Sequence, residues 1–133
     1  MLRRAFTIAL FAAALTGCAA GFQKLDPSTV NWGERPTPAQ VESAVKRHFE
    51  FALKDAESAR YQISTPYRGY ANEGALAGGG IRWAGYLVDV QVNAKNSFGG
   101  YTGYKPYQVL LTRDMNVYRA VEGSSHVLIH RLE

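Results

Sequence analysis

Alternation between apolar and polar residues over positions 81–94 limits what this chain can fold into more than any other feature. The apolar set is Tyr86, Val88, Val90, Val92 and Ala94, and the polar set between them is Asp89, Gln91 and Asn93. A period of two places each set on its own face of a strand. Because antiparallel sheets often expose one face while parallel sheets bury both, the stretch predicts a half-buried strand of an antiparallel sheet.

Shorter apolar runs predict further strands over residues 61–63, 107–111 and 117–121. The last apolar run, 126–132, is a strand or a helix. Turn residues at 114–116 suit a hairpin between two of these runs. The stretch 66–80 contains five glycines and little apolar surface, so it is predicted to be a mobile connection.

An amphipathic helix is predicted over residues 38–54. Thr37 and Gln40 are spaced as in a capping box, in which each side chain bonds the backbone N–H of the other residue. Pro38 suits the first helical position, where no N–H is needed. The apolar positions that follow at helical spacing are Val41, Ala44, Val45, His48, Phe49, Ala52 and Leu53.

Together these elements predict an α+β fold, with one N-terminal amphipathic helix packed on a small antiparallel sheet of three to five strands. The length suits a single globular domain over residues 37–133 with a modest core. Phe49 and Phe51 of the helix are both expected in that core.

Residues 1–17 have the layout of a secretory signal peptide, with two arginines, an apolar run and small residues before Cys18. The apolar run is too short to cross a bilayer as a helix, which takes about 20 residues. The segment Leu15-Thr16-Gly17-Cys18 resembles the lipobox of bacterial lipoproteins, in which the cysteine is lipidated and the preceding peptide is removed. An ordinary cleaved signal and an uncleaved transmembrane anchor are the alternatives.

The lipobox resemblance implies attachment to a membrane through acyl chains on Cys18, each buried CH₂ contributing about 0.8 kcal/mol. The alanine at position 19 implies sorting to the outer membrane, with the domain on its periplasmic face. Cys18 is the only cysteine in the chain, so no disulfide is predicted.

Residues 18–36 are predicted to form the lipidated N-terminus and a tether, because they lack sustained periodicity. A flexible segment of about 18 residues would reach roughly 20–25 Å. The alternative is that apolar side chains of this stretch dock on the domain, and the candidates are Phe22, Leu25, Val30 and, best of all, Trp32.

The charge of the chain argues against a nucleic-acid partner. Without Arg3 and Arg4 of the signal peptide, the 15 basic side chains fall to 13 against 11 acidic ones, a net charge of +2. Such a mild balance lacks the electrostatic footprint of nucleic-acid binding.

Few residues suggest catalysis or a metal site. The histidines are His48, His126 and His130, and none has a metal-ligand or catalytic spacing, so no metal or cofactor is predicted. No nucleophile-elbow motif occurs, and the glycine runs lack the Lys-Ser/Thr of a phosphate-binding loop. The alternative function is an enzyme acting on an envelope polymer, with Asp89, Lys95 or a histidine as acid or base.

Residues 93–107 are predicted to form a loop, and they carry the strongest indication of function. The candidate binding residues are Lys95, Phe98, Tyr101, Tyr104, Lys105 and Tyr107. Aromatic rings give large contact area at small entropic cost, and the intervening glycines let a ligand approach the backbone closely. An envelope protein or a glycan is the expected partner. The alternative is that the aromatic residues fold back onto the sheet.

Two motifs resemble those of a group of small exported bacterial proteins of unknown function. They are Leu53-Lys54-Asp55-x-Glu57-Ser58-Ala59-Arg60-Tyr61 and, after Gly85, Asn93-Ala94-Lys95-Asn96-Ser97-Phe98-Gly99-Gly100-Tyr101-Thr102-Gly103-Tyr104-Lys105-Pro106-Tyr107. The group typically has proline after the aspartate and cysteine-glycine before the second motif, and Ala56 and Ala84 depart from it here. The resemblance covers about residues 50–110 and implies no established activity, catalytic residue or ligand. The sequence as a whole predicts an envelope lipoprotein acting as a binding or structural module.

Overall fold

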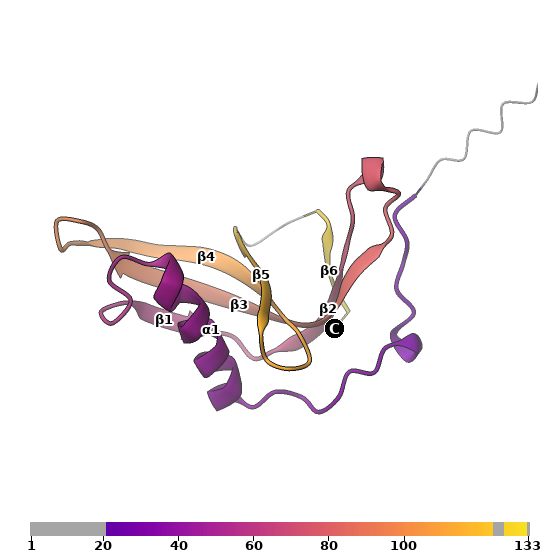
Figure 1. Ribbon diagram of the computed structural model, residues 1–133, viewed down its shortest axis with the longest axis horizontal. Coiled ribbons are helices and arrows are strands. Elements are labelled where there is room, and N and C mark those ends of the chain that lie inside the picture. Colours follow the sequence, from indigo (N-terminus) through magenta and orange to yellow (C-terminus); the bar gives the residue numbers. More distant parts are fainter. Residues whose placement is uncertain (1–20, 124–126, 133) are drawn as a thin grey trace, which may run out of the picture.

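Residues 21–123 and 127–132 are described by a computed structural model, and they form an antiparallel sheet with one α-helix against it (Figure 1). The strands are β1 (Arg60–Ile63), β2 (Tyr67–Asn72), β3 (Ile81–Lys95), β4 (Tyr101–Leu111), β5 (Val117–Glu122) and β6 (Ile129–Arg131). The helix is α1 (Pro38–Ala52), and two 3-10 helices are η1 (Pro27–Thr29) and η2 (Ala75–Ala77).

The predicted fold class, α+β with an N-terminal helix on three to five strands, was wrong. The described residues are mostly antiparallel sheet, with six strands and the single helix α1. This helix begins only at Pro38, after a segment whose one regular element is η1, so no N-terminal helix is seen in the described chain. The unexpected strand is β2, which lies inside the stretch predicted to be a mobile connection.

β2 escaped prediction because it contains a glycine, and glycine normally weakens a strand. Gly69 of β2 pairs directly with Gly85 of β3. A Cβ on Gly69 would clash with the Leu87 side chain and lie 2.8 Å from the carbonyl oxygen of His130. A Cβ on Gly85 would lie 2.5 Å from the carbonyl oxygen of Leu111. Both positions therefore require glycine for close packing of neighbouring strands.

β3 organises the sheet. The strand order is β5-β4-β3-β2-β6, and β1 also pairs with β3. One edge of β3 pairs with β4, while the other edge pairs with β1 near its C-terminal end and with β2 near its N-terminal end. β3 thus runs from the β2–β3 loop, at one end of the molecule, to the β3–β4 hairpin at the other (Figure 1).

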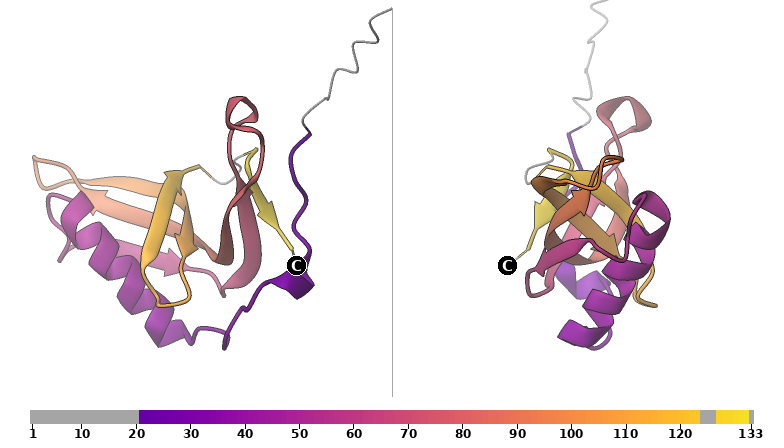
Figure 2. Two further views of the ribbon diagram at one scale, coloured as in Figure 1. Left: turned by 45° about the vertical axis from the view of Figure 1, so that its right-hand side comes forward. Right: turned by 90° about the vertical axis from the view of Figure 1, so that its left-hand side faces the viewer.

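α1 packs on one face of the twisted sheet, as the view along the long axis shows (Figure 2). The core on that face contains Val41, Ala44, Val45 and Phe49 of α1 with Tyr86, Val88, Val90, Val92, Val109 and Leu111 of the sheet. The alternation predicted for the central strand is therefore confirmed. A smaller core lies on the opposite face and consists of Tyr67, Ala71, Trp83, Leu87 and Leu110.

The start of α1 agrees with the sequence prediction. The backbone N–H of Thr37 donates to Gln40 Oε1 at 2.9 Å, and that of Gln40 donates to Thr37 Oγ1 at 3.3 Å, which completes the capping box. Phe49 is buried as expected, whereas the prediction for Phe51 was wrong because its side chain is almost fully exposed. Two residues apart on a helix point to nearly opposite sides, so both rings cannot face one core.

The segment before α1 is docked on the domain from Gln23 onward. The backbone N–H of Gln23 donates to the carbonyl oxygen of Gly79 at 2.9 Å, and Asn72 Nδ2 donates to the carbonyl oxygen of Gln23 at 2.8 Å. Leu25 is buried. Further along, the Trp32 ring meets the Tyr86 ring edge-on, with centroids 6.4 Å apart. Of the two interpretations left open by the sequence, docking is therefore observed for this stretch.

Residues 1–20, which include the predicted signal peptide and Cys18, lie outside the described residues, as does His126. Across the described ranges, no helix is both long enough and apolar enough to cross a membrane.

Candidate functional site

The predicted loop 93–107 is mostly strand. β3 continues to Lys95, β4 begins at Tyr101, and only residues 96–100 form the turn of a hairpin. Asn96 shapes this turn, because its Oδ1 accepts from the backbone N–H of Phe98 at 2.9 Å and of Gly100 at 3.1 Å. The boundary was misjudged because the glycines of this stretch lie in the turn and in a bulge inside the strand.

That bulge decides which way the aromatic residues face. Asn93 pairs with Tyr104 and Lys95 with Tyr101, so β4 has one more residue than β3 between these two pairs. Gly103 adopts a φ of 95°, and its N–H donates to Asn93 Oδ1 at 3.0 Å. Directly paired residues share a face of the sheet. Tyr101 and Tyr104 therefore both lie on the face opposite α1.

Tyr101 is fixed at the hairpin by three contacts. Its hydroxyl donates to the carbonyl oxygen of Ser58 at 2.8 Å. The Arg60 guanidinium lies 4.3 Å from the ring centroid, and Lys95 Nζ lies 5.4 Å from it. Both distances fall within the range of cation–π attraction. The ring thus has two cations within contact range while 38% of the residue remains exposed.

Phe98 and Tyr104 are the freer aromatic residues of the hairpin. Phe98 is 97% exposed in the turn, and Tyr104 is 44% exposed on β4. A fully exposed phenylalanine gains nothing for folding from its ring. This exposure makes Phe98 the most available apolar contact at this end of the molecule.

Tyr107 and Lys105 do not belong to the same surface. They pair with Val90 and Val92, whose side chains face α1. The Tyr107 ring contacts the Phe49 ring with centroids 5.1 Å apart. Burial, followed by the nearby Glu122 carboxylate, raises the pKa of Tyr107 above its ordinary value. Tyr107 is therefore a partly buried residue packed against the core, on the face of the sheet opposite to that of Tyr101 and Tyr104.

Several residues of this surface were not among the candidates. Lys54 Nζ donates to Ser97 Oγ at 2.9 Å, and Arg60 and Ser58 hold Tyr101. Asp55 orders the turn that carries them, since it accepts from the Ser58 hydroxyl at 2.6 Å and from its N–H at 3.2 Å. These hydrogen bonds, the hydroxyl first, lower the pKa of Asp55.

The two motifs noted in the sequence therefore meet in space. The first supplies Lys54, Ser58 and Arg60, and the second supplies Ser97 and Tyr101. The occurrence of both motifs in one chain was the one indication in the sequence that residues 53–61 contact the hairpin. We call Lys54, Arg60, Lys95, Phe98, Tyr101 and Tyr104 the hairpin surface.

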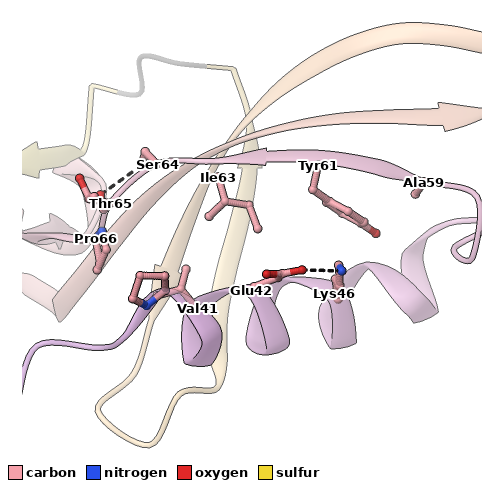
Figure 3. Close-up of a pocket in the computed structure, with 10 residues that line it drawn as sticks. Val41, Glu42, Lys46, Ala59, Tyr61, Ile63, Ser64, Thr65 and Pro66 are labelled. Atoms are coloured by element: carbon pink, nitrogen blue, oxygen red, sulfur yellow. Dashed lines mark hydrogen bonds and ion pairs between the residues drawn. The ribbon is translucent and has the colours of Figure 1, made fainter.

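A groove lies between β1 and α1 (Figure 3). It has a volume of about 400 Å³, with Val41, Tyr61 and Ile63 among its lining residues and the ion pair of Glu42 with Lys46, at 2.6 Å, on the helix side. A second hollow of about 520 Å³ shares Lys46 and Tyr61 with it. In the described chain β1 pairs only with β3, so no strand lies along its other edge.

The acid–base candidates lie apart from one another. Asp89 accepts from the Tyr67 hydroxyl at 3.1 Å through both carboxylate oxygens. Burial and then the Asp89 charge raise the pKa of Tyr67 from 10 to about 12, so its hydroxyl keeps donating to Asp89 at a pH where an ordinary tyrosine has lost its proton. His48 packs against Phe49, with ring centroids 5.2 Å apart, and His130 stacks on Tyr70 at 4.7 Å. These contacts suit structural roles.

Among residues 21–123 and 127–132, no group of three or more His, Cys, Asp or Glu side chains is arranged to hold a metal ion. Comparison with protein-family models, with curated proteins and with solved structures finds no match to this chain.

Proposed function

We propose that this protein is a lipid-anchored envelope lipoprotein whose domain acts as a binding module and contacts its partner through the hairpin surface. The observation that carries the proposal is the exposure of Phe98 beside cations that are already fixed in place. The attachment to the periplasmic face of the outer membrane, through acyl chains on Cys18, rests on the lipobox resemblance.

The position of the hairpin supports this proposal. Residue 21, where the described chain begins, and the hairpin turn 96–100 lie at opposite ends of the long axis (Figures 1 and 2). A chain anchored through Cys18 would therefore present the hairpin away from its membrane. Partners in that direction are envelope proteins or glycans.

The chemistry of the hairpin surface suits such partners. An aromatic ring with a guanidinium and an ammonium group close to it favours contact with other rings, sugar faces or acidic groups. Because Tyr101 is already ordered in the free protein, little side-chain entropy is lost when a partner binds.

Photo-crosslinking from position 104 in native envelopes tests the proposal. Tyr104 and Tyr118 are 44% and 43% exposed, and they lie on different strands, so position 118 is a matched control. We expect a discrete adduct from position 104 and none from 118. Equal adducts from both positions, or none from either, would contradict the proposal.

Substitution of Phe98 by alanine gives a second test. Since the side chain is exposed, the free energy of unfolding should stay within about 0.5 kcal/mol of the parent, as for other surface substitutions. The adduct from position 104 should fall at least five-fold. An unchanged adduct would remove Phe98 from the binding surface.

A further inference from the structure

The β2–β3 loop, at the end of the molecule away from the hairpin surface, is unusually apolar at its tip. Residues 74–80 contain no charged side chain, and the nearest charges along the chain are Glu73 and Arg82 at its base. Leu76 in η2 is fully exposed, and its alanine neighbours are exposed as well. A leucine presented in this way buries no area on folding, so its side chain is available for contact with a partner or a surface.

The N-terminal segment adds a second apolar group to this loop. Phe22 is about half exposed, and its ring atom Cδ1 lies 3.2 Å from the position that a Cβ on Gly79 would occupy. The hydrogen bond from Gln23 to Gly79 and those from Asn72 to Gln23 and Gly79 hold the two segments together. We call Phe22 and residues 75–77 the apolar tip.

The chain length fixes how far the apolar tip can be from Cys18. Only Ala19 and Ala20 lie between Cys18 and Gly21, and an extended chain spans at most about 3.6 Å per residue step. The three steps therefore keep Cys18 within about 11 Å of Gly21. Because Gln23 is docked on the β2–β3 loop, the same short stretch also keeps Cys18 near that loop.

We infer that the apolar tip rests on the bilayer that holds the acyl chains of Cys18. The inference depends on the proposed lipidation. With the acyl chains fixed so near, the exposed Leu76 and Phe22 side chains are delivered to the headgroup boundary without a further loss of translational freedom. Lys24, exposed next to this patch, suits anionic headgroups. The domain is then oriented on the membrane by two attachments, and the hairpin surface points away from it.

A depth measurement on the mature protein isolated from membranes tests this orientation. Leu76→Cys is labelled with an environment-sensitive fluorophore, and the protein is reconstituted in phosphatidylethanolamine–phosphatidylglycerol vesicles that contain lipids with a nitroxide near the headgroup. Because Cys18 is the only cysteine and its thiol would be acylated, the label reports one site. Phe98→Cys, equally exposed at the other end, is the matched control.

We expect strong quenching at position 76, at least three-fold greater than at position 98. Quenching that is equal at the two positions, stronger at 98, or absent at 76 would overturn the inference while leaving lipidation intact. The intact mass of the unsubstituted protein separates the two failures. A Cys18 that lacks acyl chains and takes up label would overturn the lipoprotein assignment and the inference with it.

Discussion

The β3–β4 turn and the β2–β3 loop close the two ends of the same long strand, and they are held by different kinds of bond. An exposed asparagine, Asn96, orders the first through hydrogen bonds within the turn. A buried asparagine, Asn72, ties the second to the distant segment around Gln23. The hairpin end carries cations and aromatic rings, whereas the other end is uncharged over residues 74–80. The hairpin turn is thus shaped by its own asparagine and also joined to the distant Lys54 through an exposed bond, whereas the β2–β3 loop is held to the N-terminal segment by a buried side chain.

The largest difference in stability is expected between two glycine-to-alanine variants, one at a closely packed position and one at an open position. Gly85→Ala brings a Cβ within 2.5 Å of the Leu111 carbonyl oxygen, so the backbone must move. A loss of about 2–3 kcal/mol in the free energy of unfolding is expected from such overpacking, measured by urea denaturation. Gly100→Ala in the turn meets nothing closer than 3.8 Å and is the control. Equal losses in the two variants would contradict this account.

Replacing each of the two asparagines by alanine tests whether the two ends of β3 are held independently. Asn72→Ala removes the side-chain donor to the carbonyl oxygen of Gln23 and one of the two donors to that of Gly79, which keeps the Gln23 N–H. In this largely buried site the loss should cost about 1–3 kcal/mol. Trypsin should then cut faster after Lys24, as the segment detaches. Asn96→Ala should cost less than about 1 kcal/mol, because water can replace its bonds, and cleavage after Lys24 should not change. Faster cleavage in both variants would show that the ends are not independent.

Alkaline pH should destabilise the region between the two ends. The pKa of Tyr67 is raised to about 12 in the folded chain, so the folded state keeps this proton after the unfolded state has lost it. Its contribution is therefore complete below pH 10 and is lost as the pH rises through 12. The loss should be roughly 1–2 kcal/mol, measured as the difference between the parent and Tyr67→Phe in urea titrations. Parallel pH profiles would exclude this role.

The smallest effects should come from Arg60 and Arg68, two of the arginines that cover aromatic rings. Arg60→Ala removes a guanidinium 4.3 Å from Tyr101, and Arg68→Ala removes one 5.4 Å from Trp32. Each exposed contact contributes about 0.5–1 kcal/mol, so both variants should melt slightly earlier. Only Arg60→Ala should weaken the adduct from position 104. Loss of the adduct in Arg68→Ala as well would show that the adduct depends on the stability of the whole domain and not on the contact of Arg60 with Tyr101.

Elements with strong local signals were predictable from the sequence. The capping box marks the start of α1, and the alternation from Tyr86 to Val92 marks the buried face of β3. The predicted number of strands was too low because the glycine at position 69 argues against a strand. Glycine is needed there because the strand packs closely against Gly85 and other residues that are remote in sequence. Both phenylalanines were expected in the core because their rings are apolar. Helical geometry places only Phe49 on the buried side and leaves Phe51 exposed.

The candidate site was predicted in part. The stretch 93–107 does contain Phe98, Tyr101 and Tyr104 at the exposed hairpin, but Tyr107 packs against the core. Arg60 and Lys54 were missed because their contacts with the hairpin cross 40 residues or more of sequence, and no periodicity reports such a distance. The bulge at Gly103, which turns Tyr101 to the face of Tyr104, is likewise a property of strand pairing.

β3 also has a mechanical consequence. Its 15 residues span about 50 Å at the usual rise of a strand, and it joins the end nearest Cys18 to the end that carries Phe98. A force between an anchored N-terminus and a partner held at the hairpin would run along this strand. The backbone hydrogen bonds to β1, β2 and β4 lie across that direction, so they would be loaded together in shear. The hydrogen bonds from Asn72 to Gln23 and Gly79 lie closest to the anchored end, so they would be loaded first and would be the first to break.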